Sequence, residues 1–282
     1  MRGTVDVMEF LRALMDFSFL QNALLGGLLA SLGCGMIGPY VVVKRISYLV
    51  GGIAHAVLGG VGVAYYFGWP PFGGALVAAV LGALLIGWVS LRWRQQEDML
   101  IGAFWAGGMA VGILFISRAP GYNVDLMSYL FGNILLITRD DLLLMAGLDA
   151  VIFTLIMVFH RQFQAVCFDE QFARLRGVGV TQFYLLLLCM VALTLVLLIQ
   201  VVGLILVIAL VSLPAAVAGQ WVRSLGAMML LATVLGAIVT LSGLGLSYGP
   251  DLPSGATIVL VSALVYFLST LMMGIRKRRV QG

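Results

Sequence analysis

His55 is one of two histidines in the chain, and it lies within a long apolar stretch. Histidine is the side chain that changes charge near neutral pH, which makes this residue the first candidate for chemistry. On a helix, Gly51, His55 and Gly59 would form one row, because residues four apart share a face. An ionisable side chain in hydrocarbon is costly and usually faces a bundle interior or a pathway. We interpret this row as the wall of a substrate pathway; a packing histidine that bonds a neighbour is the alternative.

The same stretch carries a second row of small residues at four-residue spacing. Its members are Gly52, Ala56, Gly60 and Ala64. Such rows let membrane helices approach until their backbones touch. The stretch therefore indicates a closely packed transmembrane helix that presents an imidazole within a groove of glycines.

Asp149 is another ionisable residue inside an apolar segment, seven or eight residues from its start. A carboxylate at such a depth either lines a polar route or pairs with a neighbouring helix. We include Asp149 with His55, Gly51 and Gly59 as candidate pathway residues, and the structural alternative stays open.

A polar stretch, VCFDEQFARLRGVG at residues 166–179, interrupts the apolar segments. A helix here would place its apolar residues together, with polar residues beside them and a glycine at its end. This pattern is typical of a docking element for a partner, although an ordinary solvated loop helix has the same pattern. The candidate docking residues are Phe168, Asp169, Glu170, Phe172, Arg174, Arg176 and Gly177.

Several kinds of chemistry find no support in the sequence. The two lysines, Lys44 and Lys277, do not follow glycine, so no Walker A loop is present to bind phosphates. No HExxH motif occurs, and His55 and His160 belong to different segments. We therefore predict that the chain is not an enzyme, and that any ATP that drives it is hydrolysed by another subunit.

The composition determines the class of protein. Of the 282 residues 62% are hydrophobic and only 10% are charged, with mean hydropathy +1.11. Soluble domains carry about 25% charged residues. Backbone groups in lipid must be satisfied within each segment, so the apolar runs are helices. We predict an all-α transmembrane bundle over residues 17–275, within a single transmembrane domain of residues 1–282.

The apolar runs predict about nine crossings. They cover residues 17–43, 39–67, 72–91, 98–116, 142–159, 185–199, 201–218, 225–246 and 256–273. Residues 125–138 contain an apolar centre too short to span, which favours a re-entrant or surface helix.

The charges predict an orientation. If the loop at Lys44 and Arg45 faces the cytoplasm, alternation of sides puts twelve of the sixteen Lys and Arg residues there. Cytoplasmic loops carry such an excess, so we predict an outside N-terminus and a cytoplasmic C-terminus. The same distribution argues against a nucleic-acid partner. The cations are spread over short loops, as membrane topology requires, and do not form a basic patch that could bind nucleic acid.

Four segments together resemble the membrane permeases of zinc, manganese and iron ABC importers. They are GPYVVVKRISYLVGGIAHAVLGGVG, DLMSYLFGNIL, DEQFARLRGV and LVSLPAAVA, and the resemblance extends over residues 20–272. It implies a multi-pass protein of the cytoplasmic membrane that works as a homodimer in contact with lipid. It also implies two cytoplasmic ATPase subunits, an extracytoplasmic metal-binding protein, and a coupling helix within DEQFARLRGV that docks on the ATPase. ATP would be bound by the partner, a divalent metal would be the cargo, and no intrinsic cofactor is implied.

The chain departs from that family pattern at Gly51. Known members carry an aspartate four residues before the histidine, whereas here only His55 remains as a metal-ligand candidate. One imidazole is a weak cation site, since such metals normally take several ligands. A permease for a chelated metal, such as a siderophore or cobalamin, and a stand-alone channel or secondary transporter remain alternatives.

Overall fold

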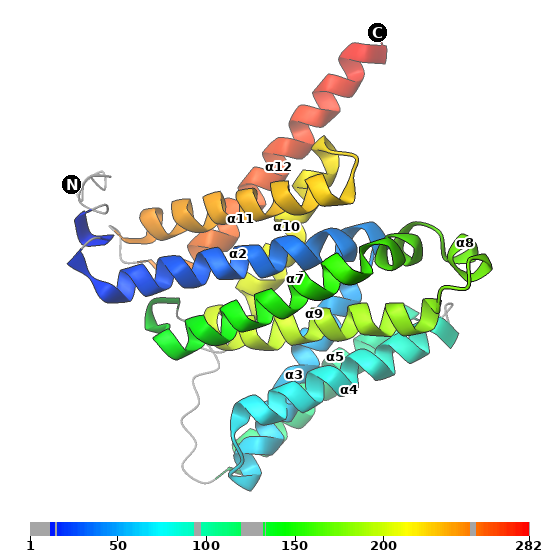
Figure 1. Ribbon diagram of the computed structural model, residues 1–282. Coiled ribbons are helices and arrows are strands. Elements are labelled where there is room, and N and C mark those ends of the chain that lie inside the picture. The colour runs from blue at the N-terminus through cyan, green and yellow to red at the C-terminus, as the bar shows by residue number, and fades with distance from the viewer. Residues whose placement is uncertain are drawn as a thin grey trace. The chain divides into compact units, whose positions relative to one another are not determined.

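The computed structural model of the protein describes residues 12–14, 16–92, 97–119, 132, 134–248 and 252–281 (Figure 1). Within these ranges the regular elements are helical, and nine helices are long and apolar enough to cross a membrane. The all-α prediction and the number of spans are thus confirmed. The nine helices are α2 (Ser18–Lys44), α3 (Ser47–Phe67), α4 (Pro71–Arg92), α5 (Glu97–Ser117), α7 (Arg139–Phe168), α9 (Val180–Val202), α10 (Leu204–Trp221), α11 (Leu225–Tyr248) and α12 (Ser254–Gln281).

Several spans differ from their predicted limits, and α7 differs the most. Helix α7 continues to Phe168, beyond the predicted end at residue 159, and its backbone leaves helical geometry only at Phe159 (φ −107°, ψ 18°). The predicted end therefore coincides with a kink, after which a second helical stretch continues to Phe168. Of the predicted short helix over 125–138, the first part lies outside the described residues, and the described part contains a 3₁₀ turn, η2 (Ile134–Leu136).

The chain forms two compact units, each assembled from segments far apart in the sequence. One contains residues 1–42, 127–151 and 201–282, and the other contains residues 43–126 and 152–200. Helices α2, α7 and α9 each run from one unit into the other. The single permease domain and the orientation of the termini stay predictions.

In the first unit, small and hydroxyl residues join α2 to α11. The Ser31 hydroxyl donates to the Gly27 carbonyl at 2.7 Å and lies 3.3 Å from the Thr240 hydroxyl. At the junction of α9 and α10, Gly203 has φ 87°, a conformation that favours glycine. Interhelical hydroxyl bonds and close contacts replace the hydrophobic effect as the force between helices in lipid.

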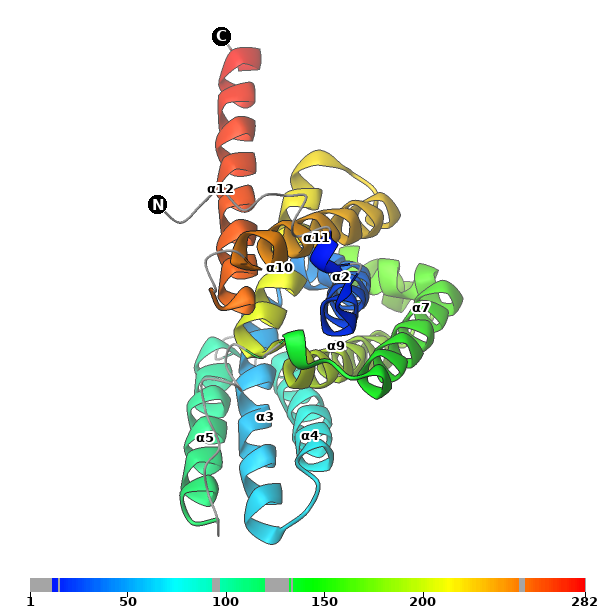
Figure 2. The same cartoon turned by 90° about the vertical axis from the view of Figure 1, so that its left-hand side faces the viewer.

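In the second unit, α3 lies between α4 and α5 (Figure 2). In the row of small residues spaced four apart, Gly52 faces α5 and Gly60 faces α4. A Cβ on Gly52 would come within 2.6 Å of Ile101 on α5, whereas one on Gly60 would overlap the Gly74 carbonyl on α4. The predicted close-packing role of this row is thus confirmed.

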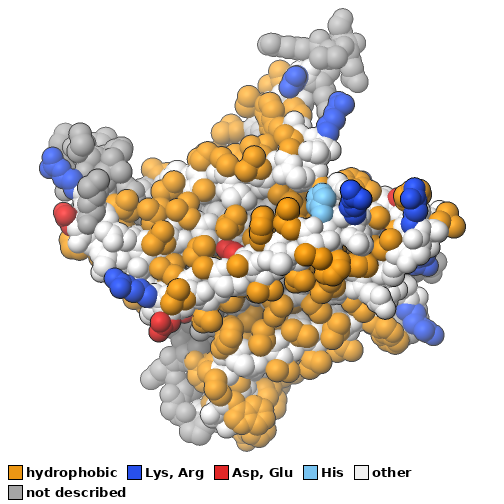
Figure 3. All heavy atoms as spheres, viewed as in Figure 1, with side chains coloured by type: hydrophobic (Ala, Val, Ile, Leu, Met, Phe, Trp, Pro, Cys, Tyr) orange, Lys and Arg blue, Asp and Glu red, His pale blue; other side chains and the backbone are white. Residues whose placement is uncertain are grey.

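Hydrophobic side chains dominate the surface that Figure 3 displays. On α7 the exposed ones include Leu143, Leu144, Val151, Phe153, Met157 and Val158. Patches of this extent on a soluble protein would mark an interface. On a membrane helix such an apolar surface is the expected one, because the surrounding hydrocarbon is itself apolar.

Candidate functional site

His55 lies in the third turn of α3, where a main-chain carbonyl holds its ring. Its Nδ1 is 2.8 Å from the Gly51 carbonyl oxygen. Because a carbonyl only accepts, Nδ1 carries the proton and donates this bond. The neutral imidazole then has its lone pair on Nε2, the arrangement in which histidine binds a metal.

Trp105 of α5 covers one face of the imidazole. The two rings are stacked, with centroids 4.0 Å apart and planes inclined by 26°. Tyr48 extends the aromatic group, with its ring centroid 6.1 Å from that of Trp105. The sequence predicts a groove that is cleared at the turns above and below His55 on its own helix, where Gly51 and Gly59 lie. Trp105 comes from a neighbouring helix, which that prediction does not address.

The two glycines beside His55 differ in their surroundings. A Cβ on Gly59 would approach the Gly108 carbonyl oxygen on α5 at 2.9 Å, so this glycine permits backbone contact. A Cβ on Gly51 would meet only Trp105, at an ordinary contact distance of 3.7 Å. Gly59 is therefore a packing residue in this structure, whereas Gly51 leaves room for a side chain next to the imidazole.

Asp149 lies on α7 and is only 7% exposed, and its Oδ2 has no hydrogen-bond partner among the described residues. It belongs to one unit and His55 to the other. Among the residues that the structure describes, no group of three or more His, Cys, Asp and Glu could hold a metal ion. The described residues therefore offer isolated metal ligands and do not form a complete metal site.

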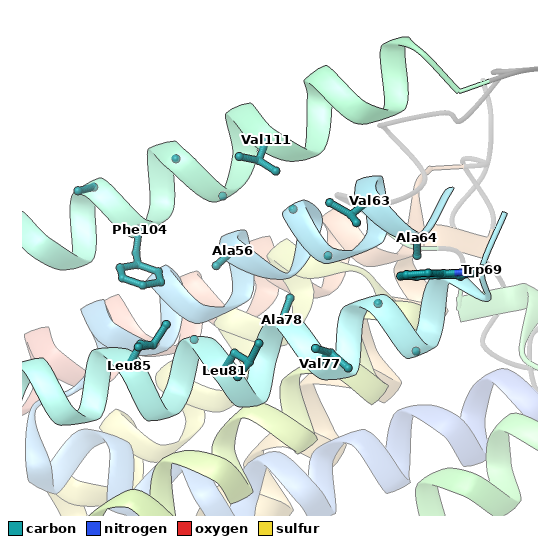
Figure 4. A pocket seen from close by; sticks show the side chains of 18 of the residues that line it. Ala56, Val63, Ala64, Trp69, Val77, Ala78, Leu81, Leu85, Phe104 and Val111 are labelled. Atoms are coloured by element: carbon teal, nitrogen blue, oxygen red, sulfur yellow. The ribbon is translucent and has the colours of Figure 1, made fainter. Parts of the chain in front are cut away.

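A groove of about 860 Å³ lies among α3, α4 and α5 (Figure 4). Phe104 and Val111 of α5 face Leu81 and Leu85 of α4, with small residues of α3 between them. All lining residues are apolar or glycine. Such a surface gives a cation no ligand in place of its hydration shell, so the groove is not a route for a free metal ion.

Within the predicted docking segment, the structure forms a short helix, α8 (Glu170–Leu175). The Asp169 carboxylate accepts the Phe172 main-chain N–H at 2.9 Å, which caps the helix. Gly177 ends it with φ 75°, and Ala173 is fully buried. Capping at both ends holds this short helix in a defined shape.

The apolar residues of the docking segment are exposed. Phe168 is 62%, Phe172 49% and Leu175 88% accessible, and the Arg176 guanidinium lies over the Phe172 ring at 5.0 Å. Phe168 ends α7 and precedes the cap, so it does not share a helix with the other two as the sequence pattern suggested.

Two other polar residues of the segment have different surroundings. Arg174 is exposed, whereas Glu170 is bound within the chain by Lys44. Arg174 thus remains available to a partner, and Glu170 has an internal role.

In the described part of the chain, nine apolar helices and an exposed, capped helix between two of them are typical of a membrane transport subunit. Residues 16–273 match the ABC 3 transport family, and the chain belongs to that family. It is a multi-pass protein of the cytoplasmic membrane.

Relatives match over nearly their whole length. An uncharacterized membrane protein of Synechocystis is 46% identical, with 94% of this chain and 95% of that protein covered. The manganese transport system membrane protein MntC of Halalkalibacterium halodurans is 35% identical, with coverage of 92% and 89%. In the solved structure of PsaBC from Streptococcus pneumoniae in complex with Fab, a chain matches with TM-score 0.84 and 33% identity, with coverage of 93% and 95%.

Proposed function

We propose that the chain is the permease subunit of an ABC importer for a divalent transition metal, with manganese as the first candidate. The observation that carries the proposal is family membership over residues 16–273, joined to manganese transport relatives such as MntC at 35% identity. The oriented imidazole of His55 within α3 is consistent with a metal as the cargo.

His55 would bind the cargo briefly through Nε2 as the ion passes. A single imidazole binds such ions weakly because their sites normally use several ligands. Gly51 supplies no carboxylate, so further ligands come from water, from another helix or from a second copy of the chain. Selection of the metal then rests largely on an extracytoplasmic binding protein.

Energy would come from two cytoplasmic ATPase subunits bound to a permease homodimer. The exposed residues of α8 and its flanks suit this contact, because an apolar anchor surrounded by polar residues is the usual form of a protein interface. This assignment requires the end of α2 at Lys44, the helix α8 that carries Arg174, and the C-terminus to lie in the cytoplasm. The charge distribution predicts that orientation.

The test is the metal content of cells that lack this chain, with manganese, zinc and iron measured together in low-metal medium. We expect manganese to fall several-fold and to recover when the chain is supplied again. Recovery should fail if the partner ATPase cannot hydrolyse ATP. A selective fall in zinc or iron would replace manganese as the cargo. Unchanged content of all three metals, or recovery without ATP hydrolysis, would contradict the proposal.

A further inference from the structure

Lys44, the last residue of α2, is bound by three different groups. Its Nζ donates to the Val166 main-chain carbonyl at 2.9 Å and forms an ion pair with the Glu170 carboxylate. It also lies 5.6 Å from the centre of the Tyr184 ring. These partners belong to α7, α8 and α9, so one ammonium group joins four helices.

The Lys44 site is largely removed from water. The side chains of Lys44 and Glu170 are 14% and 22% exposed. Removing one member of a partly buried ion pair takes away its attraction for the other charge where water screens little, which costs more than losing a fully exposed pair. The geometry of the site therefore depends on both charges being present.

The Lys44 contacts are separate from the proposed docking surface. Phe168, Phe172 and Leu175 are exposed, whereas the Val166 carbonyl and Glu170 are the groups that Lys44 binds. Loss of Lys44 would leave the exposed apolar residues and the Asp169 cap intact. Binding of a partner and fixation of α8 to the membrane helices are thus functions of different residues.

Lys44 also stands where the chain turns from α2 into α3. The next residue, Arg45, has φ 59°, and α3 begins at Ser47. His55 follows two turns further along the same helix. A displacement of α8 that is passed to Lys44 is therefore passed to the end of α2 and to the start of the helix that carries the pathway histidine.

We propose that Lys44 is a positioning residue that couples the ATPase-docking segment to α2 and α3 through Glu170. The proposal rests on the proposed function, because it takes α8 as the ATPase contact. Its consequence is that a permease without this ion pair still binds its ATPase but moves fewer ions for each ATP hydrolysed.

The experiment uses the complete importer in proteoliposomes, with metal flux and ATP hydrolysis measured on the same sample. The variants are Lys44→Met, Glu170→Gln and the double variant, with Lys44→Arg as the conservative change. Arg45→Met is the matched control, since it removes the adjacent exposed cation. Recovery of the ATPase with the permease and the thermal stability of the complex are measured for each.

We expect ions transported per ATP to fall about fivefold or more in Lys44→Met and Glu170→Gln, a typical size for coupling between two sites. ATPase recovery should stay at the parental level. Lys44→Arg and Arg45→Met should remain within about twofold of the parent, and the double variant should be no worse than the worse single variant, because the two residues act as one pair.

An unchanged flux per ATP in Glu170→Gln would overturn the proposal, even if Lys44→Met failed to assemble. A fall in ATPase recovery that matches the fall in flux would also overturn it, because Lys44 would then only support docking. Failure of the proposed function is distinguishable, since the parental protein would then recover no ATPase or show no ATP-dependent flux.

Discussion

His55 and Lys44 are held by similar groups, but among the residues that the structure describes only Lys44 has a counter-charge. Each nitrogen lies near a main-chain carbonyl, at 2.8 Å for His55 and 2.9 Å for Lys44. Each side chain also lies against an aromatic ring, Trp105 in the first case and Tyr184 in the second. Lys44 is in addition paired with Glu170.

The difference separates a fixed cation from a group that can receive one. The charge of Lys44 is compensated by a carboxylate within the chain, which suits a permanent contact between helices. The imidazole has one bond through Nδ1 and carries its lone pair on Nε2, with no carboxylate beside it at Gly51. On the proposed function, an ion that passes His55 needs this second arrangement, because a transporter must release what it binds.

The largest effect should come from the exposed face of α8. Phe172→Ala removes an aromatic anchor, and we expect ATPase affinity to fall about thirtyfold, the effect of a hot spot of about 2 kcal/mol. Binding to the purified permease in detergent measures it. Phe153→Ala is the control, because Phe153 is similarly exposed, on the α7 surface. Equal affinity in both variants would exclude α8 as the docking helix.

A smaller loss is expected at His55. His55→Ala should reduce metal uptake about tenfold, a typical cost of disturbing a metal site. The melting temperature should stay at the parental value, since only the ring's bond to Gly51 and its stacking on Trp105 are lost. His160→Ala, which removes the other histidine, is the control. Parental uptake in His55→Ala would remove His55 from the pathway, and a large loss of stability would make it a packing residue.

The smallest effect should follow when a carboxylate is placed near His55, as Glu170 lies near Lys44. Gly51→Asp introduces a carboxylate where the structure has room for a side chain. We expect manganese to be retained about threefold more tightly, as for a weak, partly exposed charge pair, and to be released more slowly. Gly51→Asn has the same size without the charge. Equal retention by the Asp and Asn variants would show that no cation comes near His55.

The spans and the main glycine contacts could be predicted from local sequence. Apolar length determines the nine helices, and four-residue spacing determines the packing row on α3. Trp105 could not be predicted as the neighbour of His55, because it is fifty positions away and no periodicity links two helices. Glu170 is 126 positions from Lys44, so the ion pair was equally inaccessible. Both contacts depend on tertiary packing.

The exposed side chains of Phe168, Phe172 and Leu175 have a consequence for biosynthesis. On the proposed assembly, they are covered only after the ATPase binds, so a newly made permease presents an apolar patch to the cytoplasm. Cellular quality control removes proteins that expose such patches, and abundance responds to small differences in the exposed population. The amount of this chain in the membrane would then follow the supply of its partner, which keeps the two subunits in proportion without a dedicated regulator.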